Sequence, residues 1–181
     1  MSITTETPRA IPTGAWALDP VHSTIGFEVD YMVGAFRGHF NDVTAKLEAA
    51  DETSLTGSAR VASVDARDED LSAHLQSPDF FDAERHPELR FASNDVELDG
   101  DRVTVRGEIT IKGITRAVEL EGTITSPITD PYGRERLGLR LAATLDRTAF
   151  DLNWNAPLPS GEPALSNEVR LSADLYFIRE A

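Results

Sequence analysis

The 181-residue chain contains no cysteine. It therefore has no disulfide bond, no thiolate nucleophile and no cysteine-ligated zinc or iron–sulfur centre. It also lacks any apolar run of about 18 residues, the length that a membrane-spanning helix needs. The first ten residues have neither a basic start nor an apolar stretch of signal-peptide length. We therefore expect a soluble, cytoplasmic protein without stable membrane insertion.

Basic residues and histidines are both scarce. There are 17 Lys and Arg against 31 Asp and Glu, and the formal net charge of −14 repels phosphate backbones, so we expect no nucleic acid partner. The four histidines, His22, His39, His74 and His86, lack the spacing at which one helix presents a pair to zinc. The chain also has no P-loop, dinucleotide fingerprint or G-x-S-x-G elbow. We therefore expect no catalytic residues and no metal, although histidines distant in sequence could converge in space.

Apolar and polar residues alternate along most of the chain after about residue 16, which is typical of strands with one buried face. The alternating segments are residues 25–33, 36–49, 55–64, 89–98, 103–112, 118–124, 137–145 and 169–177. About eight such strands leave two exposed edges unless the sheet closes, and a closed sheet of this size has room for one small ligand. The pattern predicts an all-β, eight-stranded antiparallel barrel over residues 15–181, preceded by a flexible N-terminal segment, residues 1–14.

The hydrophobic period changes between residues 66 and 84. Asp68, Glu69 and Asp70 precede Leu71 and Leu75, whose i, i+4 spacing suits a short amphipathic helix. Acidic residues in a first helical turn complement the helix dipole, which explains them without a metal ion. We expect a short helical insert at about residues 66–84.

Several positions on the predicted inner face are small, namely Gly57, Ala59, Gly107 and Gly122. Two interpretations are open. Small inward residues leave volume unfilled inside a barrel, whereas glycines also mark bends at barrel corners.

Several segments, taken in order, resemble the YceI-like family. They are residues 18–27 (LDPVHSTIGF), 36–40 (FRGHF), 74–83 (HLQSPDFFDA), 86–93 (HPELRFAS) and 109–118 (ITIKGITRAV). The resemblance covers roughly residues 15–179. It implies an extended, lipocalin-like barrel whose elongated apolar cavity holds a polyisoprenoid chain or a similar lipid.

This resemblance, together with the inner faces of the strands, predicts the residues that contact the lipid. The predicted apolar lining is Phe27, Val29, Tyr31, Phe36, Phe40, Leu71, Leu75, Phe80, Phe81, Phe91, Ile109, Ile111, Leu139, Leu141, Phe150 and Trp154. A phosphate head group needs cationic donors, and a quinone carbonyl a neutral one. The predicted contacts to a polar head group are His22, His74, Arg90 and Arg147.

Three functions are open at this point. The first, which the sequence favours, is binding of a long-chain polyisoprenoid, an isoprenoid quinone or a fatty lipid as carrier, store or sensor, with no cofactor other than that lipid. The second is a barrel enzyme that acts on a lipid-like substrate, with a metal held by His22 and His74. The third is an interaction module with a filled core and an exposed apolar patch. A homodimer is also compatible with the sequence.

Overall fold

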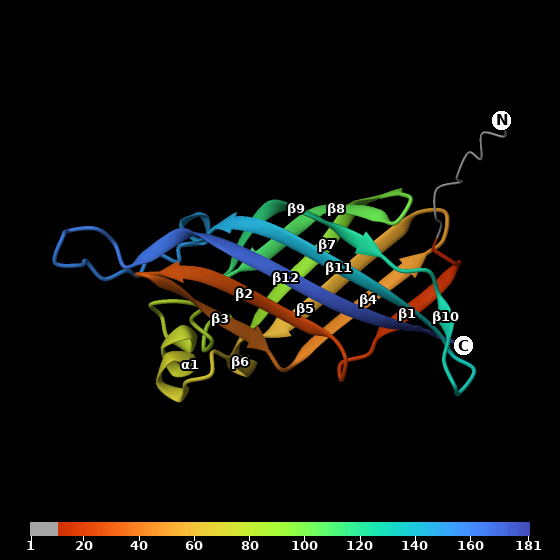
Figure 1. The fold of residues 1–181 in the computed structure, drawn as a ribbon, viewed down its shortest axis with the longest axis horizontal. Coiled ribbons are helices and arrows are strands. Elements are labelled where there is room, and N and C mark those ends of the chain that lie inside the picture. The colour runs from red at the N-terminus through yellow and green to blue at the C-terminus, as the bar shows by residue number, and fades with distance from the viewer. Residues whose placement is uncertain (1–10) are drawn as a thin grey trace.

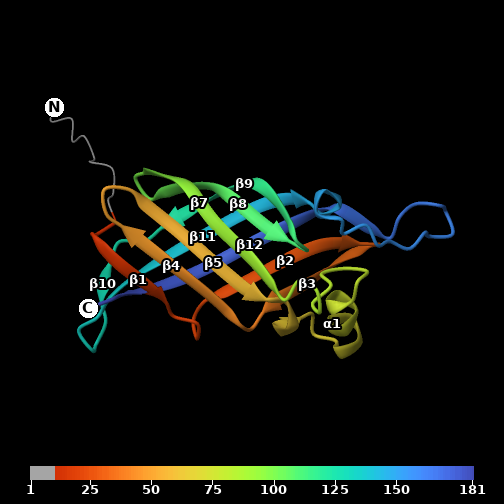
Figure 2. The same ribbon diagram turned by 180° about the vertical axis from the view of Figure 1, so that it is seen from behind.

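The computed structural model describes residues 11–181, which form one long antiparallel β-barrel with a single α-helix at its side (Figures 1 and 2). The strands are β1 (Gly14–Leu18), β2 (Thr24–Tyr31), β3 (Gly34–Phe40), β4 (Val43–Ala49), β5 (Thr53–Arg60), β6 (Val64–Asp65), β7 (Glu88–Asp99), β8 (Arg102–Ile111), β9 (Ile114–Ile124), β10 (Ile128–Thr129), β11 (Glu135–Asp146) and β12 (Leu165–Arg179). The helices are η1 (Val61–Ser63), α1 (Glu69–Gln76) and η2 (Arg147–Phe150).

The sheet closes through β12. Strands β11, β9, β8, β7, β5, β4, β1 and β12 follow one another by hydrogen bonding, and β12 pairs back onto β11. The predicted closed eight-stranded antiparallel barrel is confirmed. Closure matters physically because it satisfies backbone donors and acceptors that an open sheet leaves at its edges.

The second edge of β12 is shared between two partners. Its last residues pair with β1, with Phe177 opposite Leu18. Its earlier residues pair with β2, from Leu165 opposite Tyr31 to Asp174 opposite Thr24. Strand β2 pairs in turn with β3, which ends against β6. The hairpin of β2 and β3 therefore takes the place of β1 in the wall toward the end of the barrel where α1 lies (Figure 1).

A tight turn at Lys112 and Gly113 joins β8 to β9. Lys112 and Gly113 both have positive φ, 52° and 76°, as a two-residue hairpin turn requires. At two of the small inward positions the lack of a side chain relieves crowding against a neighbouring strand. A Cβ atom on Gly107 would lie 2.2 Å from the Ala92 carbonyl oxygen, and one on Gly122 would lie 1.6 Å from that of Arg140. Neighbouring backbones approach these glycines so closely that no side chain fits.

Three sequence predictions need correction in detail. The alternating segment 36–49 is two strands, because Asn41 and Asp42 turn the chain between β3 and β4. The inner face predicted for residues 25–33 ends early, because Met32 adopts a φ of 49° and turns Val33 into solvent. The predicted set of strands, which began at residue 25, missed β1, a separate strand before β2.

The predicted helical insert is present as α1 and its flanking loops. The Asp68 side chain caps the helix by accepting a hydrogen bond from the Leu71 backbone N–H at 2.8 Å. Leu75 is buried against the barrel core. No helix within residues 11–181 is both long and apolar enough to cross a bilayer.

The core forms two clusters along the barrel. One contains Trp16, Leu47 and Phe177, each at most 1% exposed, and it fills the end where β1 joins the wall. Ile11 packs into this cluster, while residues 1–10 of the segment predicted to be flexible lie outside the described residues. The domain boundary at residue 15 stays a prediction. The second cluster lies around Phe27, Phe81 and Phe150, toward α1.

Candidate functional site

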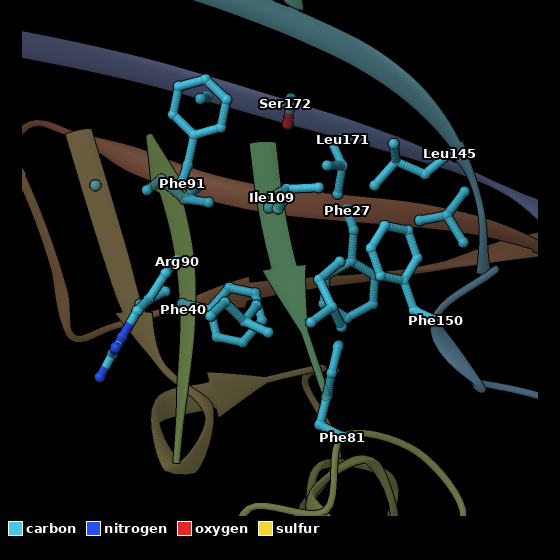
Figure 3. A pocket seen from close by; sticks show the side chains of 18 of the residues that line it. Phe27, Phe40, Phe81, Arg90, Phe91, Ile109, Leu145, Phe150, Leu171 and Ser172 are labelled. Atoms are coloured by element: carbon cyan, nitrogen blue, oxygen red, sulfur yellow. The ribbon is translucent and has the colours of Figure 1, made fainter. Parts of the chain in front are cut away.

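An apolar cavity of about 170 Å³ lies inside the barrel, mainly within the second cluster (Figure 3). Strands on all sides of the barrel contribute to its wall, which consists almost entirely of carbon atoms. The residues that line it are Ile25, Gly26, Phe27, Val29, Phe36, Phe40, Ala45, Leu55, Thr56, Gly57, Ser58, Ala59, Leu75, Phe80, Phe81, Leu89, Arg90, Phe91, Ile109, Ile111, Leu120, Leu141, Leu145, Arg147, Phe150, Leu152, Leu165, Val169, Leu171, Ser172, Ala173 and Leu175.

Aromatic rings form one side of the cavity. The ring of Phe27 lies 6.2 Å from that of Phe36, 5.9 Å from that of Phe40 and 6.0 Å from that of Phe81. These are the tilted and edge-to-face separations that aromatic pairs favour. The Phe27 ring also covers Gly38, where an added Cβ atom would lie 2.5 Å from it. The absence of a side chain at Gly38 therefore lets this ring lie back against the wall and leaves the cavity open.

The cavity is closed at the β1 end. Trp16 and Phe177 are fully buried there, and the guanidinium of Arg179 lies 5.8 Å from the centre of the Trp16 ring. Leu139, predicted to line the cavity, belongs to this packed cluster instead. It lies on β11 between Leu175, which borders the cavity, and Ile124, which does not.

Two loops cover the opposite end. Phe80 and Phe81 come from the segment after α1, and Phe150 comes from η2. Lys112 joins the two loops, because its Nζ donates hydrogen bonds to the carbonyl oxygens of Pro78 at 2.9 Å and Asp151 at 3.1 Å. A cation at the tip of one hairpin thus holds both covering loops in place.

Arg147 is a buried cation beside the cavity, with 4% of its surface exposed. Its Nε donates to the carbonyl oxygen of Ser166 at 2.8 Å, and its Nη1 donates to those of Leu152 at 2.6 Å and Trp154 at 2.8 Å. Burial lowers the pKa of the guanidinium from its ordinary value, and the neighbouring Asp146 carboxylate opposes this effect. The geometry gives Arg147 the role of holding the loop between η2 and β12 against the barrel.

Most of the predicted apolar lining lies around the cavity. The predicted residues that line it are Phe27, Val29, Phe36, Phe40, Leu75, Phe80, Phe81, Phe91, Ile109, Ile111, Leu141 and Phe150. Tyr31, Leu71 and Trp154 do not, for reasons of position. Tyr31 is 40% exposed at the end of β2, whereas Leu71 and Trp154 pack against the core cluster without reaching the cavity. Contact of any of these residues with a ligand stays a prediction.

The predicted head-group residues are not gathered in one place. Arg147 and Arg90 border the cavity, but the Arg90 side chain is 72% exposed and pairs with Glu88 at 3.1 Å. Figure 3 shows its guanidinium directed away from the cavity. His74 Nε2 lies 3.0 Å from Asp79 Oδ2, and its ring packs at 4.8 Å from that of Trp154, outside the cavity wall.

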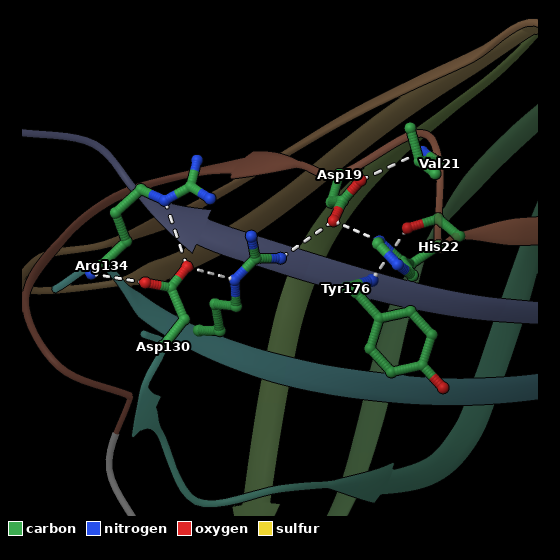
Figure 4. A network of polar contacts seen from close by, with 8 residues as sticks. Asp19, Val21, His22, Asp130, Arg134 and Tyr176 are labelled. Atoms are coloured by element: carbon green, nitrogen blue, oxygen red, sulfur yellow. Dashed lines mark hydrogen bonds and ion pairs between the residues drawn. The ribbon is translucent and has the colours of Figure 1, made fainter. Parts of the chain in front are cut away.

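His22 lies in the connection between β1 and β2, where it joins a polar network (Figure 4). Its Nδ1 is 2.7 Å from Asp19 Oδ2, which also accepts a hydrogen bond from Arg136 Nη1 at 2.9 Å. Arg136 Nε donates to Asp130 at 2.7 Å. Burial raises the pKa of Asp19, but the hydrogen bonds from His22 and Arg136 outweigh burial and lower it overall. The Arg136 hydrogen bond likewise lowers the pKa of Asp130.

The metal-assisted alternative required His22 and His74 to converge. The connection that carries His22 and the helix that carries His74 lie at different positions along the barrel in both ribbon views (Figures 1 and 2). Within residues 11–181, no group of three or more His, Cys, Asp and Glu side chains is arranged to hold a metal ion. The structure therefore does not bring these two histidines together.

The predicted lining omitted several residues that border the cavity, although the alternation of apolar and polar residues in the sequence placed them on inner faces. Leu145, Val169, Leu171 and Leu175 lie on inner faces that the alternation of β11 and β12 indicated. Leu152 and Leu165 had no such signal, because they border an irregular loop whose path depends on Arg147.

Comparison with known proteins gives a family and relatives. Residues 16–177 match the family model described as the YceI-like domain. A Staphylococcus epidermidis protein named "UPF0312 protein" is 30% identical over 168 residues, which are 88% of this chain and 94% of that protein. "Protein YceI" of Escherichia coli O157:H7 is 28% identical over 138 residues, which are 72% of this chain and 71% of that protein.

Solved structures share the fold. The crystal structure of Burkholderia cenocepacia BcnA has a TM-score of 0.76 at 21% identity and covers 88% of this chain and 98% of its own. A Saccharophagus degradans structure, described as a polyisoprenoid binding domain, has a TM-score of 0.64 at 13% identity and covers 91% of this chain and 98% of its own. At these identities the structures support the barrel architecture alone. Because the family model spans nearly all of the described residues, the chain belongs to the YceI-like domain family.

Proposed function

We propose that the protein binds a long apolar lipid, a polyisoprenoid or a related isoprenoid or fatty chain, in the barrel cavity as a carrier, store or sensor. The observation that carries this proposal is the cavity inside the barrel, whose wall is almost entirely apolar. The Saccharophagus degradans structure described as a polyisoprenoid binding domain has the same fold, which supports the choice of ligand class.

The cavity favours a hydrocarbon over water. An apolar cavity of similar size, about 150 Å³, stays dry in an engineered protein and binds benzene. At about 24 cal/mol per Å³, an empty volume of about 170 Å³ destabilises the barrel by about 4 kcal/mol. A hydrocarbon segment that fills it recovers much of this free energy. A chain longer than this segment requires the rings that cover the cavity, such as Phe81 and Phe150, to move aside.

The wall gives a charged head group little to bind. Arg147 already donates hydrogen bonds to three backbone carbonyl oxygens, and the Arg90 guanidinium points away. We therefore propose that the apolar chain lies inside and that the polar end of the lipid stays outside the cavity. No comparison indicates an enzymatic activity, so we propose binding without turnover.

The test is titration of delipidated protein with isoprenoid alcohols of ten, fifteen and twenty carbons, with thermal unfolding as the readout. We expect stabilisation to increase with chain length until the cavity is full, because each buried methylene contributes about 0.8 kcal/mol. Leu141→Glu places a charge in the wall and should abolish this stabilisation, whereas Ile128→Glu, on the exposed strand β10, should not. A folded Leu141→Glu variant that is stabilised like the wild type would contradict the proposal.

A further inference from the structure

The two segments at the end of the barrel beyond the cavity are poor in charged residues. Residues 31–36, at the turn between β2 and β3, contain no Asp, Glu, Lys, Arg or His, and residues 152–164, in the loop after η2, contain one such residue, Glu162, although 27% of the chain is charged. We call these two segments the apolar tip. The loop extends farthest along the long axis of the molecule in both ribbon views (Figures 1 and 2), with α1 to one side and set back from it.

The two segments of the apolar tip are joined. The Met32 backbone N–H donates to the Ala164 carbonyl oxygen at 2.9 Å, and Tyr31 pairs with Leu165. This arrangement exposes apolar side chains together: Val33 is fully exposed, Met32 is 54% exposed and Tyr31 is 40% exposed. Met32 holds a left-handed conformation that a non-glycine residue adopts at a cost, and the turn displays its side chain.

The apolar tip is continuous with the cavity. Val29 and Phe36 border the turn between β2 and β3, while Leu152 and Leu165 border the neighbouring loop, and all four line the cavity. A chain that leaves this end of the cavity therefore reaches the tip first. The opposite end of the barrel differs, because Trp16 and Phe177 pack it closed and its exposed Ile128 and Tyr132 lie beside the ion pairs of Asp130 with Arg134 and Arg136.

We propose that the apolar tip docks transiently onto the surface of an uncharged bilayer, so that the cavity exchanges its lipid there. This inference rests on the proposed function, since a lipid ligand has its reservoir in a membrane. The net charge of −14 means that anionic head groups repel the protein, which favours a zwitterionic surface. The tip has one charged side chain to keep solvated there, the exposed Glu162, beside the exposed apolar Met32 and Val33. Tyrosine side chains favour the membrane interface, and the tip exposes Tyr31.

The experiment compares two double variants with equal charge changes. The tip variant is Met32→Asp with Val33→Asp, and the control is Ile128→Asp with Tyr132→Asp at the opposite end. Binding is measured by co-sedimentation with phosphatidylcholine vesicles, and by quenching of Trp154 fluorescence with brominated phosphatidylcholine. Trp16, the other tryptophan, is fully buried and supplies a constant background.

We expect wild type and control to bind these vesicles and quench alike. The tip variant should bind at least about tenfold more weakly, because two side chains lose their burial and two carboxylates resist desolvation. Anionic phosphatidylglycerol in the vesicles should weaken binding of all three proteins. Equal vesicle binding by tip variant and control, or no binding by the wild type, would overturn the proposal. So would self-association of the wild type that the tip variant abolishes, if vesicle binding stays unchanged.

A second measurement separates this inference from the proposed function. Farnesol added from ethanol reaches the cavity without a bilayer, so the tip variant should bind farnesol like the wild type, which also shows that the variant is folded. If no protein binds farnesol, the proposed function fails, whatever the vesicles show. If farnesol binds and docking is absent, only the docking inference fails.

Discussion

Filling the cavity from its wall should stabilise the protein and exclude its ligand at the same time. Ala45 lies on β4 opposite Gly57, and both residues line the cavity. Replacing Ala45 with leucine adds three carbon atoms in a region where β5 supplies no side chain. Their burial contributes about 2.4 kcal/mol at about 0.8 kcal/mol per carbon, and imperfect fit subtracts from this. We expect the free energy of unfolding of the delipidated protein to rise by about 1–2 kcal/mol.

The same three carbons occupy space that a bound chain would use. A ligand that loses burial of three methylene groups binds less tightly by about 2.4 kcal/mol, which is about fiftyfold in its dissociation constant. The assays are urea unfolding of delipidated protein and titration with a twenty-carbon isoprenoid alcohol. Ala117→Leu adds the same carbons on the exposed face of β9 and serves as the control, with binding equal to that of the wild type.

Two results would refute the reasoning. If the Ala45→Leu protein is less stable than both the wild type and the Ala117→Leu control, the region is already filled and the leucine overpacks it. If the variant binds the alcohol as tightly as the wild type does, the ligand does not occupy this part of the barrel.

Three further results are expected. Arg147→Met should lower the free energy of unfolding, measured in urea, by at least about 2 kcal/mol, because it leaves buried carbonyl oxygens without a donor. An unchanged midpoint of the urea unfolding curve would mean that water replaces the guanidinium. The lowered pKa of Asp19 stabilises the fold above its unfolded value of 3.8, and this stabilisation is lost as the pH falls through the folded pKa. The stability difference between wild type and Asp19→Asn should therefore shrink in urea titrations from pH 6 to pH 3, and a constant difference would argue against this account. Gly122→Ala should prevent barrel closure, because the Cβ atom of the alanine would overlap the Arg140 carbonyl oxygen. A native circular dichroism spectrum of this variant would show that the barrel tolerates a side chain at residue 122.

The parts of the fold that follow from local rules were predictable. The alternation of apolar and polar residues placed Ile109, Ile111 and Leu141 on inner faces of their strands, and all three line the cavity. The cap at Asp68 and the turn at Lys112 follow from the backbone preferences of a helix start and of a two-residue hairpin.

Other features depended on contacts between distant segments. Leu139 alternates in phase with Leu141, yet it lies in the packed end of the barrel, because alternation fixes the face of a residue and not its depth. Arg147 was predicted to meet a head group, but the carbonyl oxygens of a loop that follows it in the chain take its hydrogen bonds. The two interpretations of the small inward residues could be compared only through distances. A Cβ atom on Gly122 would overlap a neighbouring backbone, whereas one on Gly57, which lines the cavity, would lie 3.3 Å from the Thr44 carbonyl oxygen.

The sharing of β12 among three partners bears on how the barrel assembles. Strands β2 to β9 pair mostly with near neighbours in sequence, whereas the contact of Leu18 with Phe177 joins segments far apart in the chain. Such a contact forms late, because loop-closure entropy opposes it until the intervening strands are in place. Until β12 docks, the concave apolar face of a curled, open sheet is accessible from the side. Refolding in the presence of a bulky hydrophobe should therefore trap ligands too wide to enter the finished barrel.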